Sequence, residues 1–127
     1  MLADDLDLDE VRRRARTRPP DVALGELLLD QQVVSGIGNI WRSEALFVEG
    51  RNPWAERQKL TDDDLDALVT AASSLMRASA LGAGHVPEHW VYKRSGQPCR
   101  KCGTRIESRR QGEQARTAYW CPACQPV

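Results

Sequence analysis

Residues 33–46 read VVSGIGNIWRSEAL, a stretch that interrupts one helical pattern and begins another. Gly36 and Gly38 flank Ile37, whose apolar side chain we expect to anchor the turn in the core. Glycine adopts conformations that end a helix, and without a Cβ atom it lets another backbone approach closely. Asn39 can cap the next helix or donate its side-chain amide to an oxygen anion. The stretch is therefore either an ordinary turn between packed helices or a turn whose unpaired N–H groups bind an anion such as a phosphate.

Helix signals surround this turn. An acidic cluster, a run of arginines and then Pro19-Pro20 suit a short N-terminal helix whose charges complement the helix dipole. Asp21 is a suitable cap for a second helix with a broad apolar face. Thr61 and Asp64 resemble a capping box ahead of a long helix with core spacing. The expected helices lie within residues 1–20, over about 22–34, from Asn39 to about Val48, and from Thr61 to about Gly82.

Charge is unevenly distributed in this chain of zero net charge. Residues 1–83 hold ten Lys or Arg and fifteen Asp or Glu, whereas residues 84–127 hold eight and three. A basic face is the electrostatic footprint of nucleic-acid binding, although a solvated surface can have the same composition. The arginines at 12–18 leave the same two alternatives, contact with a phosphate backbone or a solvated helix end.

The length and composition bound the class of protein. The 127 residues with 41% hydrophobic content suit one domain, or a helical domain with a small module. No apolar run approaches the ~20 residues of a membrane helix, and no secretory leader opens the chain. We expect a monomeric cytoplasmic protein with no membrane partner, associated with the nucleoid if the source is prokaryotic.

The four cysteines form two Cys-x-x-Cys pairs separated by eighteen residues: Cys99, Cys102, Cys121 and Cys124. Two such pairs can complete a tetrahedron of thiolates around one structural zinc ion with no open position. Two disulfides are a weaker alternative because nothing points to secretion, and an iron–sulfur cluster is a minor one. His85 and His89 could compete as ligands, but four cysteines already satisfy the ion.

A basic segment, GTRIESRRQGEQARTAYW, connects the two cysteine pairs. Its ends suggest strands at residues 105–108 and 117–120, with a further short strand at 92–94, and its middle suggests a fingertip. Arginines near the tip are either solvated or placed to meet phosphates. The main candidate contact in this segment is Arg116, and the weaker candidates are Lys93, Arg94, Arg109 and Arg110.

The two motifs together resemble a known family. The stretches DQQVVSGIGNIWRSEALF and VYKRSGQPCRKCG…ARTAYWCPACQ are similar to the C-terminal half of the formamidopyrimidine-DNA glycosylase/endonuclease VIII family, over essentially residues 21–125. The ending looks closer to endonuclease VIII. The resemblance implies a mainly α fold, a helical bundle with a helix–two-turn–helix motif followed by a zinc-bound β-hairpin finger. The expected units are a lead-in at 1–20, a DNA-binding helical domain at 21–90 and the four-cysteine finger at 91–127.

The resemblance also implies roles for particular residues. Asn39, with the backbone around Gly36 and Gly38, would hold a phosphate beside a lesion. Arg116 would contact the DNA backbone near a flipped nucleotide, and the four cysteines would bind Zn²⁺. The partner would be duplex DNA that is damaged or carries an abasic site.

The family's catalytic groups are not found among these residues. The family's nucleophile is a proline after the initiator methionine, followed by a glutamate, whereas this sequence reads Met1-Leu2-Ala3-Asp4. We therefore expect a chain that binds DNA without catalysis, taken from a DNA glycosylase/AP lyase of base-excision repair that acts on oxidised bases. Two alternatives stay open: a zinc-stabilised protein-interaction module, or a half-enzyme completed in trans by a separate catalytic domain.

Overall fold

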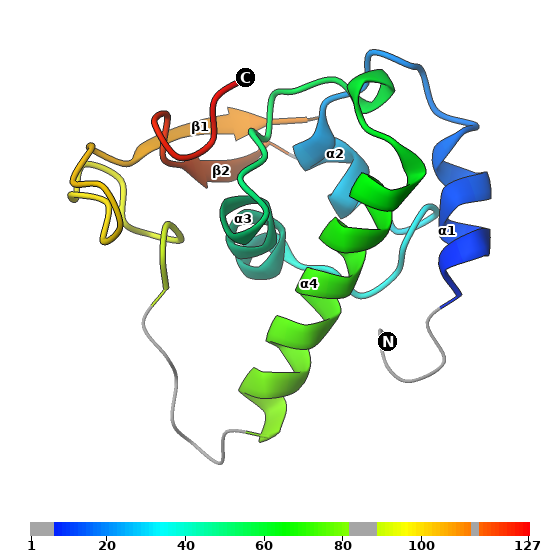
Figure 1. Cartoon of the computed structure of the whole chain (residues 1–127), viewed down its shortest axis with the longest axis horizontal. Helices are drawn as coiled ribbons and strands as arrows, with labels where there is room; N and C mark the ends of the chain where they lie inside the picture. Colours follow the sequence, from blue (N-terminus) through cyan, green and yellow to red (C-terminus); the bar gives the residue numbers. More distant parts are fainter. Residues whose placement is uncertain (1–6, 82–88, 113–114) are drawn as a thin grey trace.

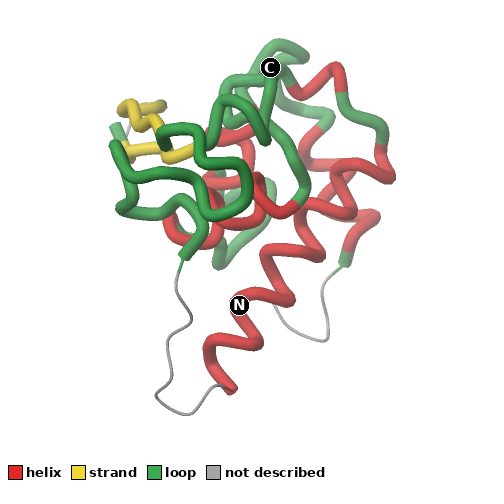
Figure 2. Tube along the Cα trace, turned by 60° about the vertical axis from the view of Figure 1, so that its left-hand side comes forward, coloured by secondary structure: helices red, strands yellow, loops and turns green. Residues whose placement is uncertain are grey.

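The computed structural model describes residues 7–81, 89–112 and 115–127. Four α-helices pack together on one side, and a two-stranded hairpin with its loops lies on the other (Figure 1). Helices and connecting loops make up most of the trace, and the strands form a small part at one edge (Figure 2). The elements are α1 (Leu8–Ala15), α2 (Leu24–Leu29), α3 (Asn39–Val48), the 3₁₀ turn η1 (Arg57–Lys59), α4 (Asp62–Leu81), β1 (Glu107–Gln111) and β2 (Arg116–Trp120).

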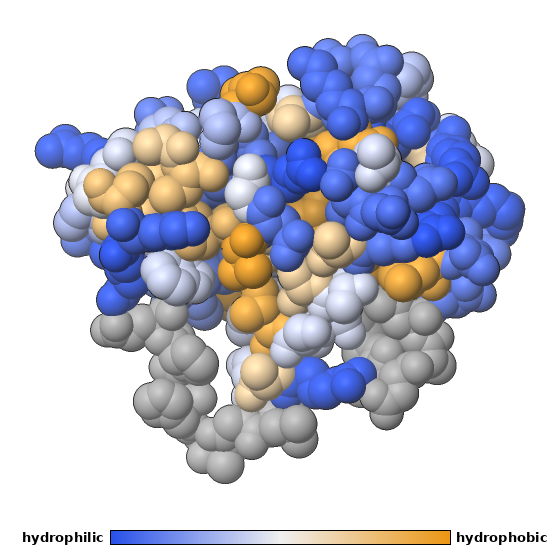
Figure 3. Space-filling model, in the orientation of Figure 1, coloured by the Kyte–Doolittle hydropathy of each residue, from blue (hydrophilic) through white to orange (hydrophobic). Residues whose placement is uncertain are grey.

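One core joins the four helices. Ile37, predicted to anchor the glycine turn, is 1% exposed and belongs to this core. Large, fully buried members come from three helices and the turn: Leu24, Leu27 and Leu28 of α2, Val33 of the turn, Leu46 of α3, and Leu68 and Val69 of α4. None of the described helices is long and apolar enough to cross a membrane. Apolar surface gathers mainly in the middle of one face, between the hairpin side and α4 (Figure 3).

A second, smaller core lies beneath the hairpin. Strands β1 and β2 pair antiparallel, with Glu107 opposite Trp120 and Gln111 opposite Arg116. The buried members of this core are Phe47 of α3 together with Val91, Cys99, Ile106 and Cys121. Helix α3 therefore contributes to both cores and fixes the hairpin against the helical part.

The boundaries of α3 and the cap of α4 were predicted correctly. Helix α3 begins at Asn39 and ends at Val48, before Gly50 with its left-handed φ of +68°. The Thr61 hydroxyl accepts the Asp64 N–H at 3.1 Å, and the Asp64 carboxylate accepts the Thr61 N–H at 3.0 Å. The predicted cap at Gly82 lies outside the described residues.

The second helix is shorter than predicted. It spans Leu24–Leu29, and its N-cap is Ala23 instead of Asp21. The chain leaves the helix at Asp30, whose carboxylate accepts the Gln32 N–H at 3.0 Å and pairs with Arg18. The apolar spacing that suggested a helix to residue 34 reflects burial, because turn residues there are also packed in the core.

The strand predictions need two corrections. Residues 92–94 form a turn, in which Lys93 has a left-handed φ of +57°. Arg105 makes only an isolated bridge to Pro98, and β1 begins two residues later at Glu107. The turn forms because the Glu44 carboxylate accepts the N–H groups at 90–92 at 2.7–3.1 Å, which takes their donors away from any sheet.

Candidate nucleic-acid interface and metal centre

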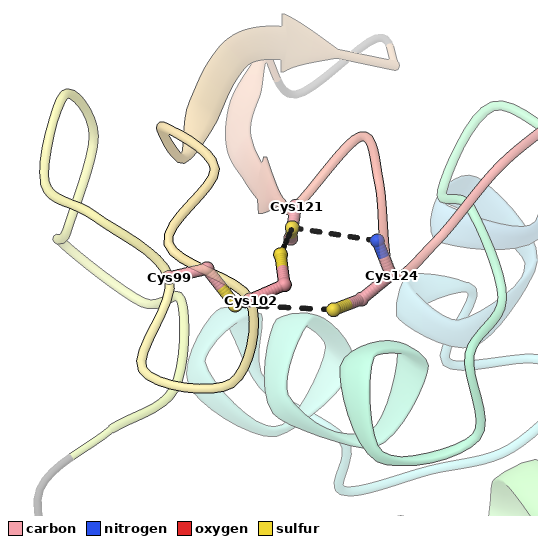
Figure 4. Close-up of side chains that lie close together, drawn as sticks. All are labelled: Cys99, Cys102, Cys121 and Cys124. Carbon is pink, nitrogen blue, oxygen red and sulfur yellow. Dashed lines mark hydrogen bonds between the residues drawn. The ribbon is translucent and has the colours of Figure 1, made fainter.

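The four cysteine thiols meet at one point between the hairpin and α3 (Figure 4). All four sulfur atoms lie within 4.8 Å of one another, with Cys99 and Cys124 3.9 Å apart and Cys102 and Cys121 3.5 Å apart. A tetrahedral zinc ion with bonds of about 2.3 Å places its sulfur ligands about 3.8 Å apart. The spacing therefore fits one metal ion of zinc size, and it leaves no disulfide among the four.

The four thiols differ in how readily they lose a proton. Hydrogen bonds from Thr104 lower the pKa of the Cys102 thiol to about 6. Burial instead raises the pKa of Cys121, and it raises that of Cys124 to about 12. Since metal ligands must be thiolates, the ion has to displace protons from the buried pair and supply the charge that keeps them ionised.

The glycine turn has two different glycines. Gly36 has φ of +96°, a conformation that L side chains rarely adopt, and its N–H donates to Oε1 of Gln31 at 2.9 Å. The same Gln31 amide donates to the carbonyl of Ile37 at 3.3 Å. Gly38 has an ordinary φ of −92°, and a Cβ built there meets nothing within 4 Å. Gly36 thus shapes the turn, whereas Gly38 leaves its outer side open at the start of α3.

Asn39 does not cap α3. The N-cap position is occupied by Gly38, and no side chain makes a capping hydrogen bond there. The Asn39 side chain reaches the hairpin instead. Its Nδ2 donates to the carbonyl of Thr117 at 2.9 Å, across 78 positions of sequence, and its Oδ1 accepts from Arg42. Asn39 therefore lies beside the residue that follows Arg116, so two candidate site residues predicted from separate motifs come together.

Arg116 stands at the start of β2 with its side chain exposed. It lines an open cavity of about 470 Å³ together with Gln31, Gln32 and Glu26 from the α2 side and Gly112 from the hairpin. The Arg116 guanidinium and the glutamine amides are groups that can bind phosphate oxygens, whereas the Glu26 carboxylate in the same lining repels them.

The other candidate cations differ in how free they are. Arg109 lies over the ring of Trp54 at 4.9 Å, and Arg94 donates to the carbonyls of Trp90 and Pro98 at 3.1 and 3.0 Å. Lys93 lies 5.7 Å from the ring of Tyr92. These three therefore have partners within the fold, although Lys93 and Arg109 are exposed, as is Arg110 on β1.

Sequence reasoning missed a row of aromatic side chains that connects α3 with the hairpin. Each ring meets the next edge-on: Trp41 with His89 at 6.1 Å, His89 with Tyr92 at 5.4 Å, and Tyr92 with Tyr119 at 5.4 Å. His89 thus contacts rings and is not part of the cysteine cluster, while His85 lies outside the described residues. Their spacing in sequence is irregular, so no periodicity could reveal the row.

The family profile described as formamidopyrimidine-DNA glycosylase H2TH domain matches residues 2–87. The chain belongs to this family. One relative, the DNA-(apurinic or apyrimidinic site) lyase Nei2 of Mycolicibacterium smegmatis, is 41% identical over 112 residues, which cover 84% of this chain and 44% of the relative. The chain thus spans about half the length of the relatives it matches.

Solved structures of the glycosylase family share the fold. The MutM (Fpg) protein of Thermus thermophilus superposes with a TM-score of 0.81 at 27% identity, over 98% of this chain and 52% of that one. The Lactococcus lactis Fpg in complex with abasic-site DNA gives 0.78 at 25% identity, over 95% and 48%. The resemblance predicted from the sequence is confirmed, and the H2TH fold fits the four helices with their hairpin and cysteine cluster.

Proposed function

We propose that this chain is the DNA-binding C-terminal region of a base-excision-repair DNA glycosylase/AP lyase that acts on oxidised bases. One observation carries the proposal: the hydrogen bond from Asn39 to the carbonyl of Thr117 brings the glycine turn and Arg116 to one surface. The two motifs are far apart in the sequence, and each offers groups that suit a phosphate. The abasic-site DNA bound by the Lactococcus lactis relative supports DNA as the partner.

The glycine turn would hold one phosphate. The open side of Gly38 admits a DNA backbone to the first N–H groups of α3. Asn39 has two hydrogens on Nδ2, so the one that Thr117 does not take can reach a phosphate oxygen. Arg116 would bind the DNA backbone from the other side, with Lys93, Arg94, Arg109 and Arg110 as weaker contacts.

Zinc would hold the finger in place for this contact. Cys99, Cys102, Cys121 and Cys124 would bind one ion in a closed tetrahedral site, which gives folding energy and no catalysis. Cys121 follows β2 directly, so the ion fixes the strand that begins with Arg116.

These 127 residues would bind DNA without cleaving it. The Schiff-base chemistry that the family resemblance implies needs a proline amine and a glutamate, and Met1-Leu2-Ala3-Asp4 offers neither. Incubation with abasic-site DNA and borohydride should leave no covalent adduct. A trapped adduct would overturn this part of the proposal.

A fluorescence-anisotropy titration tests binding. The zinc-loaded chain should bind a duplex with a central abasic analogue, and log affinity should fall with log salt at a slope of about −2 to −4, as for two to four phosphates. Arg116→Ala should weaken binding more than Arg13→Ala, a matched loss of an exposed arginine that pairs with Glu10 on α1. Equal effects of the two variants would remove the special role of Arg116, and no salt-dependent binding would favour a protein-interaction module.

A further inference from the structure

Arg42 lies where α2, α3 and the hairpin meet, and its side chain is fully buried. One guanidinium nitrogen donates to the Gln111 amide oxygen at 2.7 Å and to the Gly25 carbonyl at 3.3 Å. The other donates to Oδ1 of Asn39 and to the carbonyls of Thr117 and Arg116 at 3.2 and 3.4 Å. Five acceptors, from α2, the start of α3 and the hairpin, therefore converge on one side chain.

This arrangement is a costly way to gain stability. Among the described residues the hydrogen-bond acceptors of Arg42 are all amide or carbonyl oxygens, none of them a carboxylate, and its Nε has no hydrogen-bond partner. Burial lowers the pKa of Arg42 to about 10, and repulsion from Arg116 acts in the same direction, while attraction to the more distant Glu26 opposes both. Apolar side chains in place of buried ionic groups are often as stable or more stable. The fork geometry of the guanidinium thus calls for a role besides stability.

We propose that Arg42 is a positioning residue that joins Asn39 to the start of β2, so that the two phosphate contacts form as one unit. This inference rests on the DNA-binding function proposed above. Because Arg42 is buried, it does not touch DNA. It holds Oδ1 of Asn39, which directs Nδ2 toward Thr117 and the surface, and it holds the backbone of Arg116. A phosphate bound there would also relieve the repulsion between the two arginines.

Substitution of Arg42 by lysine tests the fork geometry of the guanidinium separately from its charge. Arg42→Lys keeps the charge and the stem, but a single ammonium group cannot span acceptors on both sides of the junction. Binding to the abasic-analogue duplex should weaken about tenfold or more. If Arg42 had only a structural role, its substitution would lower stability without a specific effect on DNA binding. Val69→Ala in α4 is the control, because it destabilises the helical core away from the contacts of Arg42.

A double-mutant cycle separates positioning from folding. In the wild-type background Arg116→Ala should weaken binding strongly, whereas in the Arg42→Lys background it should add less than about threefold. In the Val69→Ala background the loss from Arg116→Ala should stay within about twofold of the wild-type loss. Zinc content and cooperative unfolding are measured for every variant.

The outcomes distinguish the two proposals. If the wild-type chain does not bind DNA, the proposed function fails and this inference with it. If it binds and the losses at Arg42 and Arg116 multiply independently, only the positioning role is overturned. Should Arg42→Lys lose zinc or cooperative unfolding, the cycle is repeated with Asn39→Ala in its place, which removes the Oδ1 acceptor and leaves Arg42 intact. Independent losses from Asn39→Ala and Arg116→Ala would show that the two contacts do not form as one unit, and would overturn the positioning role equally.

Discussion

The buried guanidinium of Arg42 donates a 2.7 Å hydrogen bond to the amide oxygen of Gln111, which lies 69 residues later on β1. The nitrogen of the same amide donates to the carbonyl of Pro53 at 2.8 Å. Gln111 therefore ties the hairpin to the helical part at two points. The Arg42 and Gln111 side chains leave no space for a side chain at Gly25, where an added Cβ would lie 2.0 Å from the Gln111 amide oxygen and 2.9 Å from Arg42.

Gly25→Ala should destabilise the chain, although alanine normally favours a helix over glycine by about 1 kcal/mol. The new methyl group would displace the Gln111 amide and break its bonds to Arg42 and Pro53. Thermal unfolding of the zinc-loaded variant checks the sign. A higher melting temperature than wild type would show that the amide moves aside freely.

Gly38→Ala should cost no more than about 1 kcal/mol of stability, as expected for alanine at an N-cap, and should weaken DNA binding. The backbone at Gly38 is ordinary, and open space surrounds its Cβ position, so folding tolerates alanine. A methyl group there would instead meet an approaching phosphate. Anisotropy and thermal unfolding measure the two effects, and Gly96→Ala, which is also surrounded by open space but has φ of +81°, should show the reverse. Unchanged affinity in Gly38→Ala would remove the phosphate from this turn.

Removal of the metal should loosen the finger and reduce DNA binding together. Structural zinc contributes roughly 10–16 kcal/mol in finger peptides, and the finger core beneath the hairpin is small. Chelation should change the tryptophan fluorescence, because Trp120 directly precedes Cys121 and its ring lies 6.1 Å from that of Trp54. Zinc stoichiometry should be one per chain. Full DNA affinity after chelation would contradict the role given to the finger.

The capping box should stabilise α4 in a pH-dependent way. The Thr61 N–H, and then the Thr61 and Arg51 side chains, hold the pKa of Asp64 below its usual value of 3.8. A carboxyl whose folded pKa is depressed stabilises the fold above its unfolded pKa, and that contribution is lost as pH falls through the folded value. The difference in unfolding free energy between wild type and Asp64→Asn should therefore be largest at pH 5–7 and shrink below about pH 4. A difference independent of pH would show that the charge of Asp64 is not involved.

Thr61→Ala should cost about 1 kcal/mol of unfolding free energy. The hydroxyl satisfies the N–H of Asp64, and alanine leaves it to water. Denaturant unfolding measures the change, with Thr70→Ala as a control on the exposed face of the same helix. Equal effects of both substitutions would mean that the cap is not used in solution.

Local signals explain what the sequence could predict. Gly38 and Gly50 lie on either side of α3, and a threonine and an aspartate three residues apart cap α4. The spacing of the cysteines predicts the four-cysteine cluster. Each of these depends on neighbours within a turn or on a motif of fixed spacing. Asp30 shows the limit, since its side chain ends α2 earlier than the apolar pattern indicates.

Distant partners explain what the sequence could not predict. Glu44 is buried in α3, and its three N–H partners lie 46–48 residues away. Arg42 likewise has its decisive partners in the hairpin. A charged residue within a core-facing helix indicates that its side chain has buried polar partners, but the sequence does not say which loop provides them.

The central claim is that the glycine turn and the start of β2 form one DNA-binding surface. Amide chemical shifts of the ¹⁵N-labelled, zinc-loaded chain during titration with an abasic-analogue duplex test this most directly. The account predicts that Gly36, Gly38 and Asn39 shift together with Arg116 and Thr117 and give one dissociation constant. Shifts confined to other elements, such as α1, with these amides unmoved, would contradict it.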